Sequence, residues 1–401
     1  MSKLRHWKAP AAHAHGNGTP FENVALLLQG GGALGAYQAG VYEALAEREI
    51  EPGWIAGISI GAINSAIIAG NPPKDRIGKL RAFWEGVSAH SGGWASGWTD
   101  WLPHLVHNPT IRSAANQLAA GTALIHGAPG FFGPRLLPPA FHPSGSAGAT
   151  SFYDTTPLKG TLERLVDFDR INARKTRFSV GAVNVRTGNF VYFDNATDTI
   201  RPEHIMASGA LPPGFPPVEV DGEHYWDGGL VSNTPLDWVL SSNSGLDTLV
   251  FQVDLWSARG NLPTDMPSVA VRTKEIQYSS RTRAATEVFR ERQQLRLAFR
   301  KLTQGMTPEQ LDTPEARLLI EATDAAAFNI VQLVYHSPTY EGESKDYEFS
   351  RQTMEDHWRT GYEDAQRTLS HKEVLRLPDD PAGVAVYDFT GPFHEGGHHR
   401  R

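Results

Sequence analysis

The chain has 401 residues, a net charge of −7 at pH 7 and no cysteine. Its length allows a large core and two or three domains. The missing cysteines exclude disulfides, cysteine metal sites and thiol catalysis, and the negative charge gives no reason to expect general nucleic-acid binding. The sequence has no uninterrupted apolar run of the roughly 18 residues that a transmembrane helix needs, so no such helix is expected. The missing cysteines fit a reducing cytosol, and we expect a cytoplasmic protein.

The N-terminal part predicts a strand–helix–strand unit. Residues 1–23 contain no apolar core and are expected to form a flexible tail. The apolar run 24–28 ends in glycines, which is typical of a buried parallel strand. Residues 36–48 have helical spacing, 54–58 form a second short strand, and 60–69 are small and apolar, as in a helix packed closely on a sheet.

Residues 84–143 are rich in Trp, Gly, Pro and His and keep no period for long. They predict an irregular insertion within the first domain. Two interpretations stay open: a segment with its own small core, or a lid that contacts lipid, since the clustered Trp94, Trp98 and Trp101 suit an amphipathic interface.

The next elements continue an α/β pattern. Residues 177–185 and 190–194 predict two strands around a turn, and 204–211 predict a short helix that ends at two prolines. Residues 218–225 alternate around an Asp-Gly pair, which indicates a hairpin. Residues 248–254 predict another buried strand.

Residues 256–401 differ in character and predict a mainly helical C-terminal extension. Residues 272–301 form a long polar stretch with several arginines, and 353–369 also have helical spacing. The first stretch carries an apolar stripe that we expect to be buried, made of Val288, Leu295, Phe299 and Leu302.

Two glycine motifs carry the chemistry. Gly30-Gly31-Gly32-Ala33-Leu34-Gly35 follows the first strand, and its backbone N–H groups are suited to hold an oxyanion. Gly57-Ile58-Ser59-Ile60-Gly61 has the form G-x-S-x-G, which places a serine on a sharp strand-to-helix turn. A nucleophile beside an oxyanion cradle predicts acyl transfer.

A serine nucleophile needs a base, and three arrangements compete. One is a Ser–His–acid triad, for which His336 and His357 are the formal candidates, although no marked loop surrounds either. The second is a Ser–Asp dyad with Asp227, which is followed by Gly228 and Gly229. These glycines allow backbone angles that other residues avoid, and would let the chain pass close to the serine turn. The third arrangement has no catalysis.

The first glycine motif also fits the dinucleotide fingerprint G-x-G-x-x-G, with Glu51 roughly where a ribose-binding acid would lie. A nucleotide site, however, explains neither the serine turn nor Asp227.

Taken together, these motifs resemble those of the patatin-like phospholipase family over residues 24–255. The likeness extends to Ala207-Ser208 through Pro216-Pro217, and to Asn233 and Pro235. It implies a three-layer α/β/α fold with a mainly parallel central sheet, and lipid acyl-ester hydrolysis without a metal or other cofactor. Many members carry Arg or Lys where this chain has Leu34, so a preference for anionic head groups is not implied.

The resemblance also implies residue roles. Ser59 would be the nucleophile and Asp227 the base of a dyad without histidine. The oxyanion hole would come from the loop residues Gly30, Gly31, Gly32 and Ala33, and the supporting motif glycines would be Gly35, Gly57, Gly61, Gly228 and Gly229.

We therefore predict a serine ester hydrolase of patatin type that works through an acyl-enzyme. The alternative is a non-enzymatic lipid- or protein-binding module on the same fold. The expected partner is a lipid or other acyl ester. Peripheral contact with a membrane, and a homodimer formed through the C-terminal extension, both stay open.

Overall fold

The structure is a computed structural model that describes residues 19–89, 109–242, 245–279, 282–303, 305–321, 326–338, 341–342, 344–379 and 383–391. Most of the predicted N-terminal tail lies outside these residues, and so do Trp94, Trp98 and Trp101.

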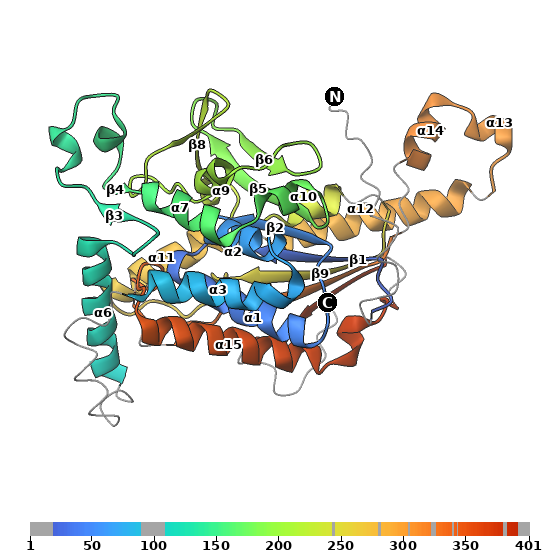
Figure 1. The fold of residues 1–401 in the computed structure, drawn as a ribbon. Coiled ribbons are helices and arrows are strands. Elements are labelled where there is room, and N and C mark those ends of the chain that lie inside the picture. The colour runs from blue at the N-terminus through green and yellow to red at the C-terminus, as the bar shows by residue number, and fades with distance from the viewer. Residues whose placement is uncertain are drawn as a thin grey trace.

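A mostly parallel sheet runs through the middle of the molecule (Figure 1). In the described residues it has nine strands, in the order β11 (Val384–Asp388), β10 (Phe328–Val334), β9 (Thr248–Asp254), β1 (Asn23–Leu28), β2 (Trp54–Ile58), β5 (Arg177–Asn184), β8 (Glu223–Asp227) and β7 (Val218–Val220), with β6 (Phe190–Asp194) also paired to β5. Neighbouring strands from β11 to β5 are parallel, whereas β6 and β8 run antiparallel to β5.

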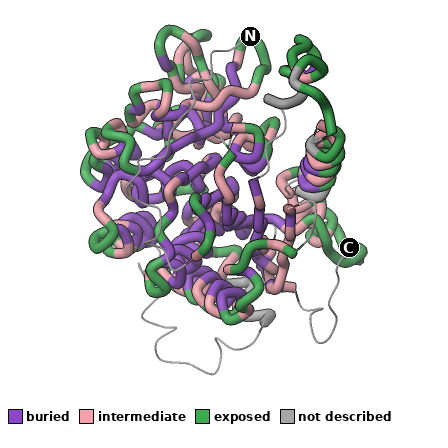
Figure 2. Tube along the Cα trace, turned by 90° about the vertical axis from the view of Figure 1, so that its right-hand side faces the viewer, coloured by how far each residue is buried: buried purple, intermediate pink, exposed green. Residues whose placement is uncertain are grey.

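Helices cover both faces of the sheet, which makes three layers. One face carries α1 (Ala36–Glu47), α2 (Ile60–Ala69), α3 (Pro73–Val87), α7 (Thr156–Leu165) and α15 (Arg351–Leu369), and the other carries α10 (Leu236–Ser241) and α12 (Thr282–Thr303). Strand β1 shows why the sheet is buried on both sides. Val24, Leu26 and Leu28 belong to the first core, and Ala25 and Leu27 to the second. Buried residues accordingly fill the middle of the molecule (Figure 2).

The remaining elements lie around this frame. They are η1 (Gly32–Gly35), α6 (Pro109–His126), β3 (Gly133–Pro134), η3 (Pro139–Phe141), η4 (Ala147–Thr150), β4 (Tyr153–Asp154), α8 (Phe168–Asn172), α9 (Pro202–Ser208), η5 (Gly228–Leu230), α11 (Met266–Tyr278), α13 (Pro308–Leu311), α14 (Pro314–Glu321) and η6 (Lys372–Leu375). Figure 1 shows α6 at one end of the molecule and α13 with α14 at the other.

The three-layer fold and the helical C-terminal part are confirmed, but two strands were missed. β10 and β11 both come from residues after 256, and β10 pairs with β9 over its whole length. Helix α15 packs on α1 and buries Trp358. The C-terminal residues are therefore part of the central sheet and of its core.

The predicted apolar stripe of the long C-terminal helix is not buried within this chain, and its burial in a homodimer stays a prediction. That stretch is two helices, α11 and α12, and Val288, Leu295 and Leu302 on α12 are exposed. The helix is rotated so that Phe289 is buried instead, with its ring centroid 4.8 Å from that of Phe328 on β10. Periodicity identified the apolar positions of this helix but not which of them faces the sheet.

The expectation of irregular structure over 84–143 also needs correction. Residues 84–87 end α3, and α6 is a regular helix of 18 residues. Trp84, Phe131 and Phe132 join the main core, where Phe83 and Phe131 contact each other edge-on.

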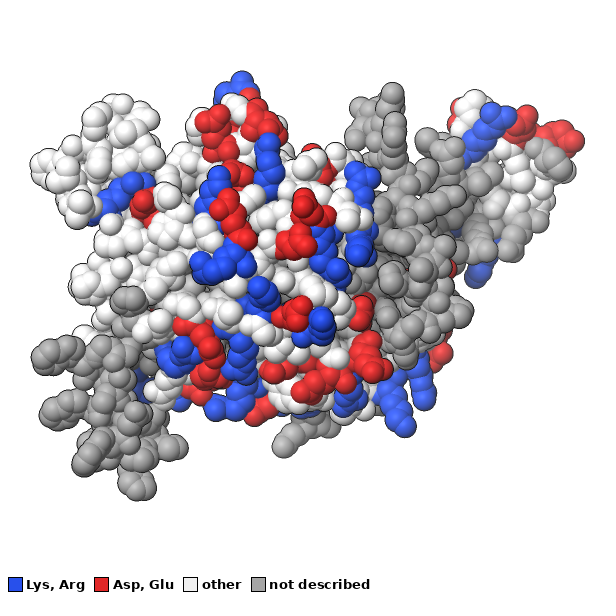
Figure 3. All heavy atoms as spheres, in the orientation of Figure 1, with Lys and Arg blue, Asp and Glu red and all other residues white. Residues whose placement is uncertain are grey.

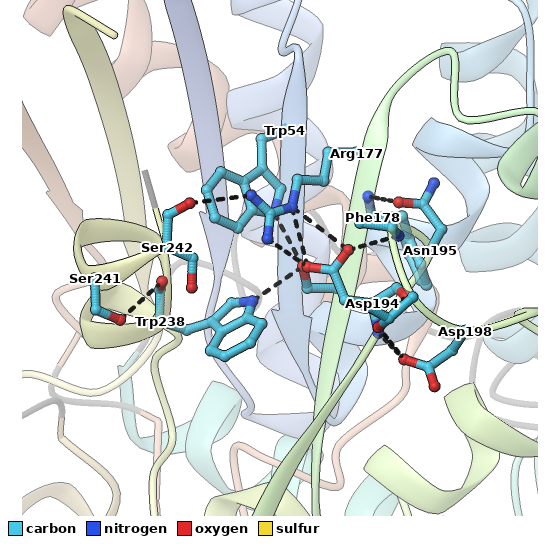
Figure 4. A network of polar contacts seen from close by, with 12 residues as sticks. Trp54, Arg177, Phe178, Asp194, Asn195, Asp198, Trp238, Ser241 and Ser242 are labelled. Atoms are coloured by element: carbon cyan, nitrogen blue, oxygen red, sulfur yellow. Dashed lines mark hydrogen bonds and ion pairs between the residues drawn. The ribbon is translucent and has the colours of Figure 1, made fainter. Parts of the chain in front are cut away.

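A buried charge pair stabilises the end of the sheet where β5 begins (Figure 4). The Arg177 guanidinium lies 3.7 Å from the Trp54 ring centroid and 2.9 Å from a carboxylate oxygen of Asp194. Ser179 donates to Asp194 at 2.8 Å and accepts from Trp54 Nε1 at 2.9 Å. Because both charges have several partners, burying them is tolerated. The network joins β2, β5 and β6.

Candidate active site

The serine turn and the glycine loop meet at one edge of the sheet. Leu28 on β1 is in register with Gly57 on β2, and these parallel strands end side by side. The loops that follow them, Gly30–Gly35 and Ser59 with the start of α2, therefore open in the same direction.

Ser59 has the backbone angles φ 56° and ψ −124°, which are unfavourable for a residue with a side chain. The turn is held by Ser208, whose Oγ accepts the Ser59 N–H at 3.0 Å and donates to the Gly181 carbonyl at 2.6 Å. Helix α2 begins directly after Ser59 and directs its positive end toward the hydroxyl, which favours negative charge there.

Asp227 ends β8, where its neighbour across the ladder is Ala182 on β5. It is 2% exposed. Burial raises the pKa of its carboxyl to about 7, although hydrogen bonds from the Ser59 side chain and the Gly229 N–H lower it in part. The Gly229 bond measures 2.7 Å. The predicted nucleophile and base thus line the same cavity, with the Ser59 side chain close enough to lower the pKa of the carboxyl. A carboxylate beside a hydroxyl can accept its proton.

The glycines after Asp227 serve a different purpose from the predicted one. Neither Gly228 nor Gly229 has a positive φ. A Cβ on Gly228 would lie 2.7 Å from the Gly181 carbonyl oxygen. Lack of space, and not the backbone angle, requires glycine at that position.

Two of the four N–H groups predicted to bind the oxyanion are already bonded to carbonyl groups of the protein. The Gly30 N–H donates to the Asn233 carbonyl at 3.4 Å, and the Ala33 N–H donates to the Asp346 carbonyl at 2.8 Å. This corrects the four-residue prediction, because an N–H that is already bonded is not available to substrate. Gly31 and Gly32 line the cavity beside Ser59 and bond to no acceptor in the described residues. Gly35, Gly57 and Gly61 flank the two loops.

A cavity of about 270 Å³ lies over Ser59 and Asp227. Among its described lining residues only Asp227 and Asp346 carry a charged group. Most of the others are apolar or aromatic, including Leu124, Phe131, Phe132, Tyr153, Leu211, Phe215, Trp256, Tyr347 and Phe349. Such a wall suits an acyl chain.

Tyr278 also lines the cavity. Its pKa is raised by burial and by the negative charges of Asp227 and Asp346. Its carbonyl accepts from the Asn233 side chain at 2.8 Å, and Asn233 donates to the Gly30 carbonyl at 3.1 Å.

The histidine alternatives lie elsewhere. Neither His336 nor His357 lines the cavity, and neither bonds to Ser59 or Asp227. Burial lowers the pKa of His336. His357 is buried on α15, and Glu341, 3.0 Å away, raises its pKa against the opposing effect of burial.

The sequence did not predict the roles of three residues that hold the serine turn and the glycine loop. Ser208 holds the serine turn, Asn233 ties Gly30 to Tyr278, and Asp346 supplies the carbonyl that occupies Ala33. The first two belong to motif segments noted in the sequence. Asp346 has no sequence signal, since it lies more than 300 residues from the loop it contacts.

The comparisons with known proteins agree with this architecture. A family model described as patatin-like phospholipase matches residues 26–240, which is more than half of the chain. The chain belongs to the patatin-like phospholipase family. A second model, described as patatin phospholipase, matches residues 276–381. Membership of this family supports lipid acyl hydrolysis as the general class of activity.

Among solved structures, VipD from Legionella pneumophila is similar to this patatin-like chain at 17% identity. The match covers 88% of this chain and 67% of VipD, with a TM-score of 0.36. None of the curated proteins compared with the chain matches it. In the part of the chain that the structure describes, no helix has both the length and the apolar character to cross a membrane.

Proposed function

We propose that the protein is a serine ester hydrolase in which Ser59 and Asp227 form a catalytic dyad. The observation that carries the proposal is the position of Ser59 and the buried Asp227 carboxyl together at the wall of an apolar cavity, where the Ser59 side chain lowers the pKa of the carboxyl. The family supplies the general class of activity, and this contact supports the particular residues.

In the first half-reaction, Asp227 accepts the proton of the Ser59 hydroxyl while Oγ attacks the acyl carbonyl carbon. The carbonyl oxygen becomes an oxyanion, which the Gly31 and Gly32 N–H groups stabilise. The intermediate collapses, the bond to the alcohol breaks, and Asp227 returns the proton to the leaving oxygen. The acyl group is then bound as an ester of Ser59.

In the second half-reaction, Asp227 takes a proton from water, whose oxygen attacks the acyl-enzyme. Collapse releases the carboxylic acid and restores the Ser59 hydroxyl. A carboxyl with a pKa of about 7 suits both directions of transfer near neutral pH, since proton exchange is most efficient when the pKa lies close to the working pH.

We propose a lipid ester as substrate, taken up from a lipid surface that the protein contacts peripherally. Exposed apolar side chains lie on α6, whose Leu124 also lines the cavity, and in residues 136–152: Leu118, Leu124, Ile125, Leu136, Leu137, Phe141 and Phe152. Between Arg112 and Asp154 the sequence has a single charged residue, Arg135. The corresponding end of the molecule is largely uncharged in Figure 3.

A homodimer stays a separate proposal. Its candidate surface is the exposed seven-residue repeat of Val288, Leu295 and Leu302 on α12.

A fluorophosphonate probe tests the dyad. We expect it to label Ser59 stoichiometrically, and we expect Ser59→Ala to lower kcat on a water-soluble ester by about 10³-fold or more. Ser65→Ala is the matched control, because Ser65 lies on the same helix, is fully buried and does not line the cavity. Wild-type turnover by Ser59→Ala would overturn the assignment. A folded wild-type protein that neither reacts nor hydrolyses esters would favour the non-enzymatic binding module.

A further inference from the structure

A short C-terminal segment, residues 344–349, lies across the glycine loop. The Asp346 carbonyl accepts the Ala33 N–H at 2.8 Å. Gly32 has φ +55°, and a Cβ there would lie 2.0 Å from the same carbonyl oxygen. Asp346, Tyr347 and Phe349 also line the cavity. This segment is therefore both a wall of the cavity and a support for the loop.

The segment is held by Lys345. Its side chain is 2% exposed, and its Nζ lies 3.0 Å from a Glu275 carboxylate oxygen and donates to Ser337 Oγ at 2.8 Å. The ammonium also lies 5.1 Å from the ring centroid of Trp256. A buried charge is tolerated only where partners surround it, so this set of contacts specifies one position for Lys345.

Trp256 and α11, which provide partners for Lys345, also hold the glycine loop and Asp346. Trp256 Nε1 donates to the Gly30 carbonyl at 3.0 Å. Lys274, next to Glu275 on α11, bonds to the Asp346 carboxylate at 2.8 and 3.1 Å. Trp256 and residues 344–349 thus bond to the glycine loop, and α11 holds residues 344–349 through Lys274 and Glu275; all of these follow residue 255.

An oxyanion hole depends on donors that are already in place before the reaction. A loop of three consecutive glycines has much backbone freedom and does not hold such a geometry by itself. Residues 344–349, which lie outside the loop, supply the missing restraint.

We propose that Lys345 is a positioning residue for ester hydrolysis. Paired with Glu275, it fixes residues 344–349 so that the Asp346 carbonyl holds Ala33, while the N–H groups of Gly31 and Gly32, which line the cavity, stay available to a substrate oxyanion. The inference rests on the proposed function and gives the C-terminal part of the chain a role in it: completing the oxyanion loop.

Lys345→Met tests the inference. Glu275 keeps its 3.0 Å bond to Arg272 in this variant, so no carboxylate is left without a cation. We expect kcat on a water-soluble ester to fall about 10- to 100-fold with little change in KM, since misplaced donors weaken transition-state binding more than substrate binding. The inhibition constant of a trifluoromethyl ketone, which forms a tetrahedral oxyanion on serine, should rise by the factor by which kcat/KM falls.

Hydrogen exchange gives a second measurement that does not depend on activity. In Lys345→Met, amide exchange over residues 29–35 should become faster, because Ala33 loses its fixed acceptor, while exchange over residues 60–66 should not change. If Lys345→Met does not fold, Glu275→Gln removes one charge of the pair and keeps its shape, and smaller effects of the same direction are expected.

Arg177→Met is the control, because Arg177 also belongs to a buried ion pair and neither it nor Asp194 lines the cavity. It should lower thermal stability and leave kcat and loop exchange unchanged in the folded protein. A folded Lys345→Met protein with wild-type kcat, or with unchanged exchange over residues 29–35, would overturn the proposal. Failure of Ser59 labelling would instead overturn the proposed dyad. The exchange measurement over residues 29–35 would then still test whether Lys345 positions the glycine loop.

Discussion

The serine turn and the glycine loop face the same cavity, but different parts of the chain hold them. Ser59 is held by Ser208 and, through it, by Gly181, all within the segment from β2 to α9. The glycine loop takes its restraints from Asn233, Trp256 and Asp346. The proposed nucleophile is thus supported by residues of the patatin-like half, whereas the glycine loop depends on contacts with residues that are more distant in sequence.

Deleting all residues after 255 is the most drastic test of this comparison. The variant removes β10 and β11, which exposes the apolar edge of β9, and removes α15 from α1. We expect aggregation and no soluble active protein, since an unpaired buried strand and an uncovered core face both promote association. Size-exclusion chromatography with an esterase assay measures this. A monomeric, fully active fragment would show that the glycine loop needs no support from the C-terminal part.

Asp227→Asn should nearly abolish activity, by about 10³-fold, because the amide cannot accept the Ser59 proton. The variant keeps the size of the side chain, so circular dichroism should show the native fold. His336→Ala is the control and should retain kcat. If the histidine variant is folded and as inactive as Asp227→Asn, the protein uses a histidine base instead.

The pH dependence of kcat/KM should report the ionisation of Asp227. Since the base must be charged, activity should rise tenfold per pH unit below about 7 and level off above it. The raised pKa has the opposite effect on stability. The contribution of this carboxyl is fully present below its ordinary pKa of 3.8 and is lost as the pH rises through about 7. A rate that levels off near pH 4 would contradict a buried base.

Ser208→Ala tests the other side of the comparison. The Ser59 N–H loses its acceptor in a strained turn, and a lost buried hydrogen bond costs about 1–3 kcal/mol. If this cost falls on the transition state, kcat drops roughly tenfold. Exchange should increase over residues 57–63 and stay unchanged over 29–35, the reverse of Lys345→Met. Loosening of both loops in either variant would mean that they form one cooperative unit.

The smallest effect concerns the apolar surface near the cavity. We expect Ile125→Glu to lower hydrolysis of a lipid ester in zwitterionic vesicles several-fold, because a charge opposes insertion of α6 into the interface. Hydrolysis of a water-soluble ester should not change. Leu377→Glu, at an exposed leucine that follows η6, is the control. Equal losses on vesicles in both variants would argue against a specific lipid-facing surface.

Most of the catalytic-domain frame was predictable because it depends on local patterns. The strands 24–28 and 54–58 appear as β1 and β2 with small changes at their ends, and the hairpin around Asp221-Gly222 is β7 with β8. Prediction from the sequence failed for elements whose position depends on what they pack against. Residues 328–334 join the sheet only because β9 offers a free edge, and α12 buries Phe289 because β10 lies beneath it.

By itself, the sequence determined the motifs of the site, since a serine turn, a glycine loop and an Asp-Gly-Gly turn are each a matter of a few consecutive residues. It also determined that their strands are parallel neighbours, because a short crossover unit leaves little choice. Only the tertiary structure decided which N–H groups remain available and how buried Asp227 is. Both depend on a carbonyl, a cavity wall and a desolvated pocket assembled from residues more than 300 positions apart, and such contacts leave no mark in local sequence.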